Sequence, residues 1–131
     1  MVQPVRRGAR RTLARLGAVG VLAVAALIVS AGPAAAATSS CAVQLFFTSC
    51  NTGAVAAHPY GHYVKYEVGG GVACARADWQ VIDVGNGQIV AFGHVGSGRT
   101  SGQVNGLYGN YKVRVFNSCW PAFGRIWNQY P

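Results

Sequence analysis

The N-terminal segment constrains the fold most, because it sets both the compartment of the chain and the length that remains. An apolar run over residues 18–29, with Gly20 its only non-hydrophobic member, ends in small residues at 34–37. Five arginines and no acidic residue precede it, at Arg6, Arg7, Arg10, Arg11 and Arg15. A basic start, an apolar run of about a dozen residues and a small-residue end are typical of a secretory signal. We predict an export signal over residues 1–37 and a single mature domain over residues 38–131.

A membrane anchor is the alternative for this segment. A helix of 12 residues is only about 18 Å long, too short for a hydrocarbon core of about 30 Å. Pro33 interrupts any longer helix over residues 17–37. We therefore expect contact with the membrane only in transit, by general secretion, with twin-arginine export through Arg10 and Arg11 left open.

Four cysteines lie in the predicted mature domain, at Cys41, Cys50, Cys74 and Cys119. An even number of cysteines in a small exported chain indicates disulfides. Three pairings are possible, and we favour Cys41–Cys50 with Cys74–Cys119, one local loop and one long closure. Structural zinc needs closely spaced cysteine pairs, which the gaps of this sequence do not provide.

Net charge says little about the mature domain. The whole chain carries +8, but much of this charge lies in the predicted signal, and the mature part carries only +3. Nucleic-acid binding requires basic residues gathered on one face, so we expect no nucleic-acid partner.

Short β-rich segments separated by glycine turns predict an all-β fold. Residues 62–68 and 111–116 alternate between apolar and polar side chains, as half-buried strands do. Gly85-Asn86-Gly87 between two β-rich segments is a strong hairpin signal. We predict an antiparallel β-sandwich of six to eight strands, with Tyr111 as a structural corner tyrosine and the strand at 125–130 at a sheet edge. The expected strands cover residues 42–47, 62–68, 72–75, 79–84, 88–92, 100–105, 111–116 and 125–130.

Catalytic and metal sites find little support in the sequence. The mature part has three carboxylates, Glu67, Asp78 and Asp83, and three histidines. His58 and His62 cannot share a helix face across Pro59, so we expect no metal and no cofactor. A ribonuclease would need a general base, a general acid and a cation that binds the phosphate. Glu67, His62 and Arg114 come nearest to such a set. We assign no catalytic residue and expect no enzyme.

Binding residues are easier to nominate. If strands 62–68 and 111–116 are neighbours, Tyr63, Lys65, Lys112 and Arg114 form an aromatic and basic patch suited to an acidic surface. Trp127 and Tyr130 are candidates for exposed binding aromatics, with Tyr108 added for a polysaccharide. We expect Trp79 and Trp120 to pack in the core.

The sequence resembles two kinds of secreted protein. The arginine- and alanine-rich signal looks like those of actinobacterial exported proteins. The mature part, with four cysteines and short strands between Cys41 and Cys119, is similar in plan to the tendamistat-type α-amylase inhibitors. That resemblance implies a six-stranded sandwich with sequential disulfides, Cys41–Cys50 and Cys74–Cys119. The family's inhibitory Trp-Arg-Tyr triplet is absent from the interval 42–49, so no inhibitory residue is carried over.

These observations favour a secreted bacterial protein that binds rather than catalyses. We expect an inhibitor-like or binding protein that acts on an extracellular protein or polysaccharide, with association with the cell wall left open. A carbohydrate or cell-wall binding module is the first alternative. A small secreted hydrolase such as a ribonuclease is the second.

Overall fold

Two antiparallel sheets make up the part of the chain that the computed structural model describes, residues 37–129. The predicted signal, apart from Ala37, lies outside these residues, and so does Tyr130. The described part contains no helix, which confirms the all-β prediction. Its strands are β1 (Thr38–Ala42), β2 (Cys50–Asn51), β3 (Val55–Ala56), β4 (Tyr63–Gly69), β5 (Ala77–Asp83), β6 (Ile89–Val95), β7 (Arg99–Asn105), β8 (Asn110–Phe116) and β9 (Phe123–Trp127).

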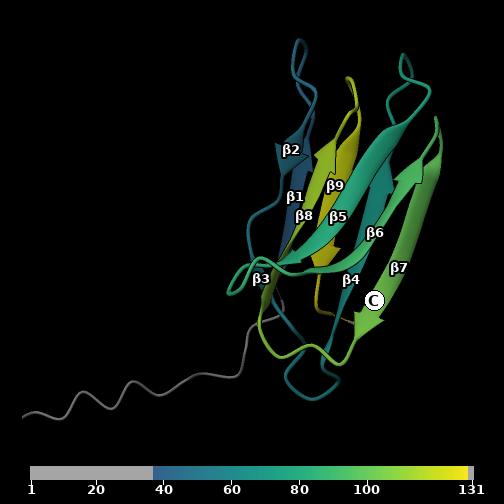
Figure 1. Cartoon of the computed structure of the whole chain (residues 1–131). Coiled ribbons are helices and arrows are strands. Elements are labelled where there is room, and N and C mark those ends of the chain that lie inside the picture. Colours follow the sequence, from purple (N-terminus) through teal and green to yellow (C-terminus); the bar gives the residue numbers. More distant parts are fainter. Residues whose placement is uncertain (1–36, 130–131) are drawn as a thin grey trace, which may run out of the picture. The chain divides into compact units, whose positions relative to one another are not determined.

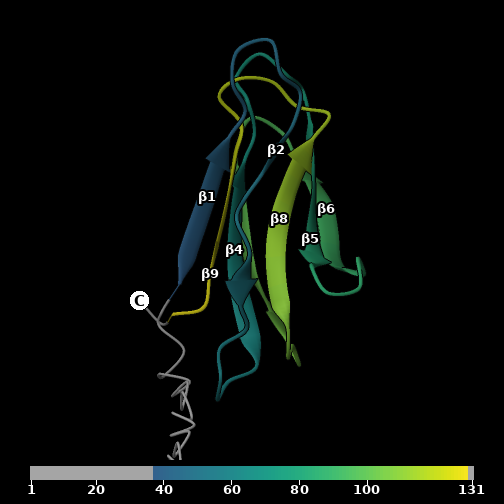
Figure 2. The same cartoon turned by 90° about the vertical axis from the view of Figure 1, so that its left-hand side faces the viewer.

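The two sheets pack face to face as a sandwich. The first sheet has the strand order β1-β9-β4-β7, and the second has the order β2-β8-β5-β6 with β3 also paired to β8. Figure 2 shows the two layers nearly edge-on, with β1, β9 and β4 on one side and β8, β5 and β6 on the other. Because strands adjacent in sequence often lie in different sheets, the chain crosses repeatedly between the layers (Figure 1).

The core lies between the sheets and follows the predicted alternation. Val64 and Val68 of β4 are fully buried, and so are Val113 and Val115 of β8. Trp79 of β5 is also buried, as expected, and its ring packs against Tyr66 with 4.7 Å between centroids. Side chains two residues apart share one face of a strand, which is why alternation identified these strands correctly.

Two local predictions are confirmed at the ends of strands. β5 and β6 form the hairpin predicted around Asn86, where Gly87 has the positive φ that such turns need. Tyr111 opens β8 and is buried, and its hydroxyl accepts a hydrogen bond from the Gly109 amide at 3.4 Å. Tyr111 therefore has the structural role expected of a corner tyrosine.

Three strand predictions are wrong. The first strand is Thr38–Ala42 rather than 42–47, and residues 43–49 form a loop. Residues 72–75 also lie in a loop, between β4 and β5. β9 is central in its sheet, between β1 and β4, because β1 covers the side predicted to be an edge.

Both disulfides have the pairing that we favoured. Cys41–Cys50, the short bridge, spans 9 residues, and Cys74–Cys119, the long bridge, spans 45. The short bridge closes the loop 43–49 between β1 and β2. The long bridge joins the β4–β5 loop to the β8–β9 loop, so both bridges stabilise the same end of the sandwich.

Candidate binding site at the apolar loop end

Three loops meet at the end of the sandwich that the bridges stabilise. They are residues 43–49, 70–76 and 117–122, which Figure 1 shows together at the top of the molecule. The Val43 amide donates to the Ala122 carbonyl at 2.7 Å, and the Ser118 amide donates to the Thr48 carbonyl at 3.1 Å. These contacts and the long bridge hold the three loops against one another.

Two glycines let the backbone of the second loop lie directly against the backbones of neighbouring loops. A Cβ at Gly71 would lie 2.4 Å from the carbonyl oxygen of Cys119. A Cβ at Gly70 would lie 1.6 Å from the carbonyl oxygen of Gly96, in the β6–β7 loop. Glycine at both positions therefore allows the loops to pack more tightly than any other residue would.

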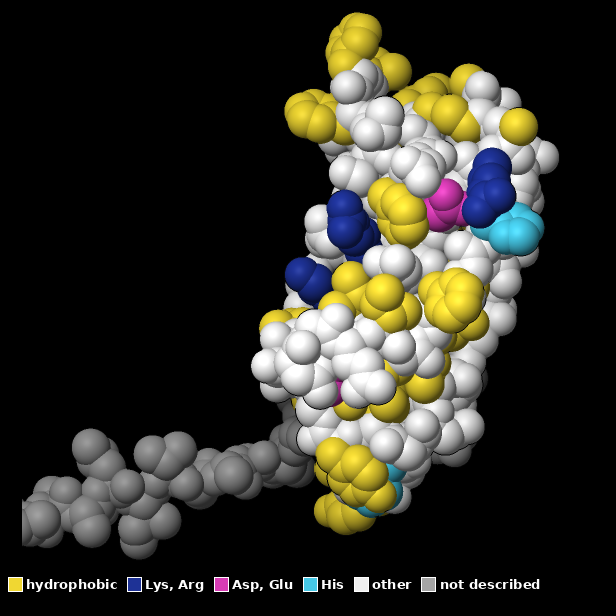
Figure 3. All heavy atoms as spheres, in the orientation of Figure 1, with side chains coloured by type: hydrophobic (Ala, Val, Ile, Leu, Met, Phe, Trp, Pro, Cys, Tyr) yellow, Lys and Arg dark blue, Asp and Glu magenta, His cyan; other side chains and the backbone are white. Residues whose placement is uncertain are grey.

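Large apolar side chains project from this rigid frame into solvent. We call the group the apolar loop end: Leu45, Phe46, Phe47, Val72 and Trp120, each at least half exposed. Figure 3 shows hydrophobic side chains gathered at this end of the molecule. Residues 43–49 and 117–122 include no charged residue, and the loop 70–76 includes one, Arg76 at its far end, which pairs with Asp78. An exposed apolar cluster of this kind is typical of an interaction surface.

Phe46 is the most prominent member of the cluster. Its side chain is fully exposed, and its φ of 72° lies in the left-handed region that bulky residues seldom adopt. The Phe47 amide donates to the Gln44 carbonyl at 3.1 Å, which closes a turn with Phe46 at its third position. Turns with positive φ there favour glycine or asparagine. A phenylalanine at this position costs of order 1–3 kcal/mol and places a phenyl ring at the tip of the loop.

A shallow hollow of about 420 Å³ lies beside the projecting side chains. Its lining includes Phe47 from the first loop, Cys74 from the second and Trp120 from the third. Burying one large apolar side chain contributes roughly 1.5–3 kcal/mol. Because no charge must be desolvated, this surface suits association with a complementary apolar surface rather than chemistry on a substrate.

The predicted aromatic and basic patch does not form. β4 carries Tyr63 and Lys65 on the first sheet, whereas β8 carries Lys112 and Arg114 on the second, so the two strands are not neighbours. Tyr63 is also buried rather than solvent-facing, because His58 from the preceding loop stacks on its ring with 4.9 Å between centroids.

The other nominated aromatic residues lie apart from the apolar loop end. Trp127 is half-buried on β9, beside Lys65 of β4 and under the Arg125 guanidinium. Tyr108 is exposed in the β7–β8 loop, where it packs against His62 with 4.4 Å between centroids. Trp120, predicted to be a core residue, is half exposed and belongs to the apolar loop end.

The residues named for a ribonuclease are not assembled. Glu67 lies on the first sheet and pairs with Arg99 at 3.4 Å, whereas Arg114 lies on the second sheet. Asp83 accepts a hydrogen bond from the Gly85 amide at 2.7 Å and so stabilises the β5–β6 turn. Among residues 37–129, no three His, Cys, Asp or Glu side chains gather where they could hold a metal ion.

Sequence reasoning missed the apolar loop end because it interpreted apolar segments as buried. The signal that could have found it is the position of 42–49 between two cysteines only nine residues apart. A disulfide that closes so short a segment leaves little length for a core strand and its return. Leu45-Phe46-Phe47 in such a loop must lie near its tip.

Comparison with known proteins adds no family. No family model matches the chain, and no curated protein or solved structure matches it significantly. Within the described residues, no helix is long and apolar enough to cross a membrane.

Proposed function

We propose that this protein is a secreted, non-catalytic binding protein that contacts an extracellular protein partner through its apolar loop end. The observation that carries the proposal is the exposure of five large apolar side chains at the end where both disulfides lie. Rigid loops lose little conformational entropy on binding, so more of the energy of burial appears as affinity.

The chemistry of the surface indicates the kind of partner. Aromatic residues are enriched at the centres of protein interfaces, and charged residues are depleted there. Phe46, Phe47 and Trp120 provide aromatic anchors in loops without charge. The partner should therefore offer an apolar cleft that accepts a protruding loop, as the substrate cleft of an extracellular hydrolase does.

The test uses the oxidised mature protein, residues 38–131, as bait for the proteins of the producing culture's supernatant and wall fraction. We expect a discrete stoichiometric complex that Phe46→Ser weakens by at least tenfold. Tyr60→Ser is the matched control, because Tyr60 is also an exposed aromatic residue but lies in a loop outside the cluster, between β3 and β4.

Three outcomes would overturn the proposal. They are the absence of any protein complex, a complex that Phe46→Ser leaves unchanged, and a complex that Tyr60→Ser weakens as much. Circular dichroism of each variant establishes that it remains folded, so a loss of binding reports the surface.

A further inference from the structure

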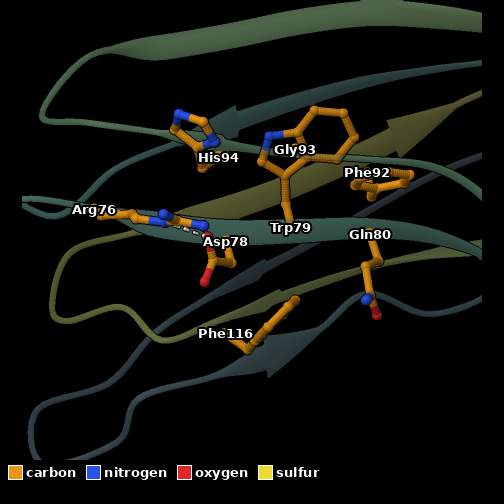
Figure 4. A pocket seen from close by; sticks show the side chains of 8 residues that line it. All are labelled: Arg76, Asp78, Trp79, Gln80, Phe92, Gly93, His94 and Phe116. Carbon is orange, nitrogen blue, oxygen red and sulfur yellow. Dashed lines mark hydrogen bonds and ion pairs between the residues drawn. The ribbon is translucent and has the colours of Figure 1, made fainter.

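A second hollow lies on the outer face of the second sheet, on strands rather than loops. It has a volume of about 260 Å³, and β5, β6 and β8 provide most of its lining. Direct cross-strand partners point to the same side of a sheet. Asp78 is paired with both His94 and Phe116, and Gln80 is paired with Phe92, so these side chains share the outer face. Figure 4 shows the two phenyl side chains on opposite sides of β5.

The polar groups of this hollow are charged but compensated. The Arg76 Nε donates to one carboxylate oxygen of Asp78 at 2.6 Å, and the Asn117 Nδ2 donates to the other at 2.8 Å. Each carboxylate oxygen keeps capacity to accept another hydrogen bond. Arg76 neutralises Asp78, so this ion pair gives the hollow no net charge. The Arg114 guanidinium, cross-strand from Gln80, lies over the Phe116 ring and adds a positive charge at the rim of the hollow.

Unused hydrogen-bonding capacity lies next to this ion pair. Within residues 37–129, no side-chain hydrogen bond engages Gln80 or His94. The Gln80 amide offers donors and an acceptor in one plane, and the His94 imidazole offers one of each when neutral. Hydroxyl groups both donate and accept, so they match such a mixed set of partners.

The aromatic rings complete the pattern. Phe92 is 77% exposed on β6, and Phe116 is half-buried on β8 beneath the Arg114 guanidinium. Two strand spacings and two residues along a strand separate their positions, which gives about 12 Å. One sugar ring cannot cover both phenyl groups, whereas a short oligosaccharide can place successive rings over them.

We infer that this hollow binds a neutral oligosaccharide. The apolar C–H face of one sugar ring would lie on Phe92, a second ring would lie against the part of Phe116 that the Arg114 guanidinium leaves uncovered, and the hydroxyls would bond to Asp78, Gln80 and His94. This site goes beyond the proposed function, because it occupies a sheet face and shares no residue with the apolar loop end. It also differs from the polysaccharide site expected at Trp127, Tyr130 and Tyr108.

The experiment titrates the oxidised mature protein with three neutral probes in a calorimeter: cellohexaose, maltohexaose and chitohexaose. We expect at least one to bind, with Phe92→Ala and Gln80→Ala each weakening it by tenfold or more. Tyr108→Ala is the matched control, because Tyr108 is as exposed as Phe92 but lies in the β7–β8 loop. Binding should change little between 50 and 500 mM salt, because the ligand is neutral.

Each contrary outcome is decisive. No binding of any probe overturns the inference, and so does binding that Phe92→Ala and Gln80→Ala leave unchanged or that only Tyr108→Ala weakens. Phe46→Ser separates the two proposals, because it should abolish capture of the protein partner and leave oligosaccharide affinity intact.

Discussion

Thr52 occupies a gap in the second sheet where a side chain replaces the backbone. β2 ends at Asn51 and β3 begins at Val55, and both strands pair with β8. Between them the Thr52 amide donates to the Val113 carbonyl at 2.9 Å, and the Val113 amide donates to the Thr52 hydroxyl at 3.0 Å. The same hydroxyl donates to the Gly53 carbonyl at 2.9 Å. A threonine hydroxyl therefore completes the hydrogen bonding of β8 where the partner strand is interrupted.

Thr52→Val tests this role, because it removes the hydroxyl and preserves the shape of the side chain. Thr52 is 5% exposed and Val113 is fully buried, so the Val113 amide would lose its acceptor without access to water. An unsatisfied buried donor costs about 1–3 kcal/mol. We expect a loss of about 2 kcal/mol in the free energy of unfolding, or about 10 °C in Tm for a domain of this size.

Urea unfolding of the oxidised domain, residues 38–131, measures the change, with an unchanged m-value showing that the denatured state is the same. Thr100→Val on β7 is the control and should change stability by less than about 0.5 kcal/mol. Hydrogen exchange at the Val113 amide should accelerate in Thr52→Val alone. Equal stability of the two variants, or undiminished protection of Val113, would refute the argument.

Three further predictions concern backbone packing, pH and the disulfides. Gly70→Ala should destabilise the domain by more than about 2 kcal/mol in urea unfolding, because its Cβ would overlap a backbone carbonyl, whereas Gly98→Ala, with no atom within 4 Å, should be neutral. The hydrogen bond that Asp78 accepts from Asn117, and after it the one from Arg76, lowers the pKa of the Asp78 carboxyl. The stability that ionised Asp78 contributes is therefore present above pH about 4 and is lost as the pH falls through the folded-state pKa. Unfolding at pH 7 and pH 3 should show a smaller loss on acidification in Asp78→Asn than in the wild type. A disulfide that closes a longer loop removes more conformational entropy from the unfolded chain. Replacing both cysteines of the long bridge by alanine should therefore lower stability by about 4 kcal/mol, against about 2.6 kcal/mol for the short bridge. Equal losses in calorimetric unfolding would contradict this dependence on loop length.

Local patterns in the sequence predicted much of the strand content. Alternation identified β4 and β8, because a half-buried strand must place every second side chain in the core. The Asn86 turn identified the β5–β6 hairpin, because few residues accept the backbone conformation of such a turn. These features depend on residues that are close together in the sequence, so one sequence is enough to predict them.

Local patterns could not predict which distant segments pair with each other. β4 and β8 alternate alike, yet they lie in different sheets, so Lys65 and Arg114 do not share a face. The burial of Tyr63 depends on His58 and the loop that covers the outer face of β4. Neither placement follows from periodicity, because each depends on how the whole chain crosses between the sheets.

The failure at residues 42–47 is of a different kind and bears on function. Apolar side chains are usually buried, and the domain could have placed Leu45, Phe46 and Phe47 in its core. Instead the short bridge holds them in a loop, and Phe46 adopts a backbone conformation that costs energy while its side chain stays fully exposed. Folding stability alone does not explain such an arrangement, because a glycine at position 46 would relieve the strain. Where the local preferences of a sequence conflict with its structure, the conflict often marks a functional site. The conflict at Phe46 therefore supports our proposal that the apolar loop end is a binding surface.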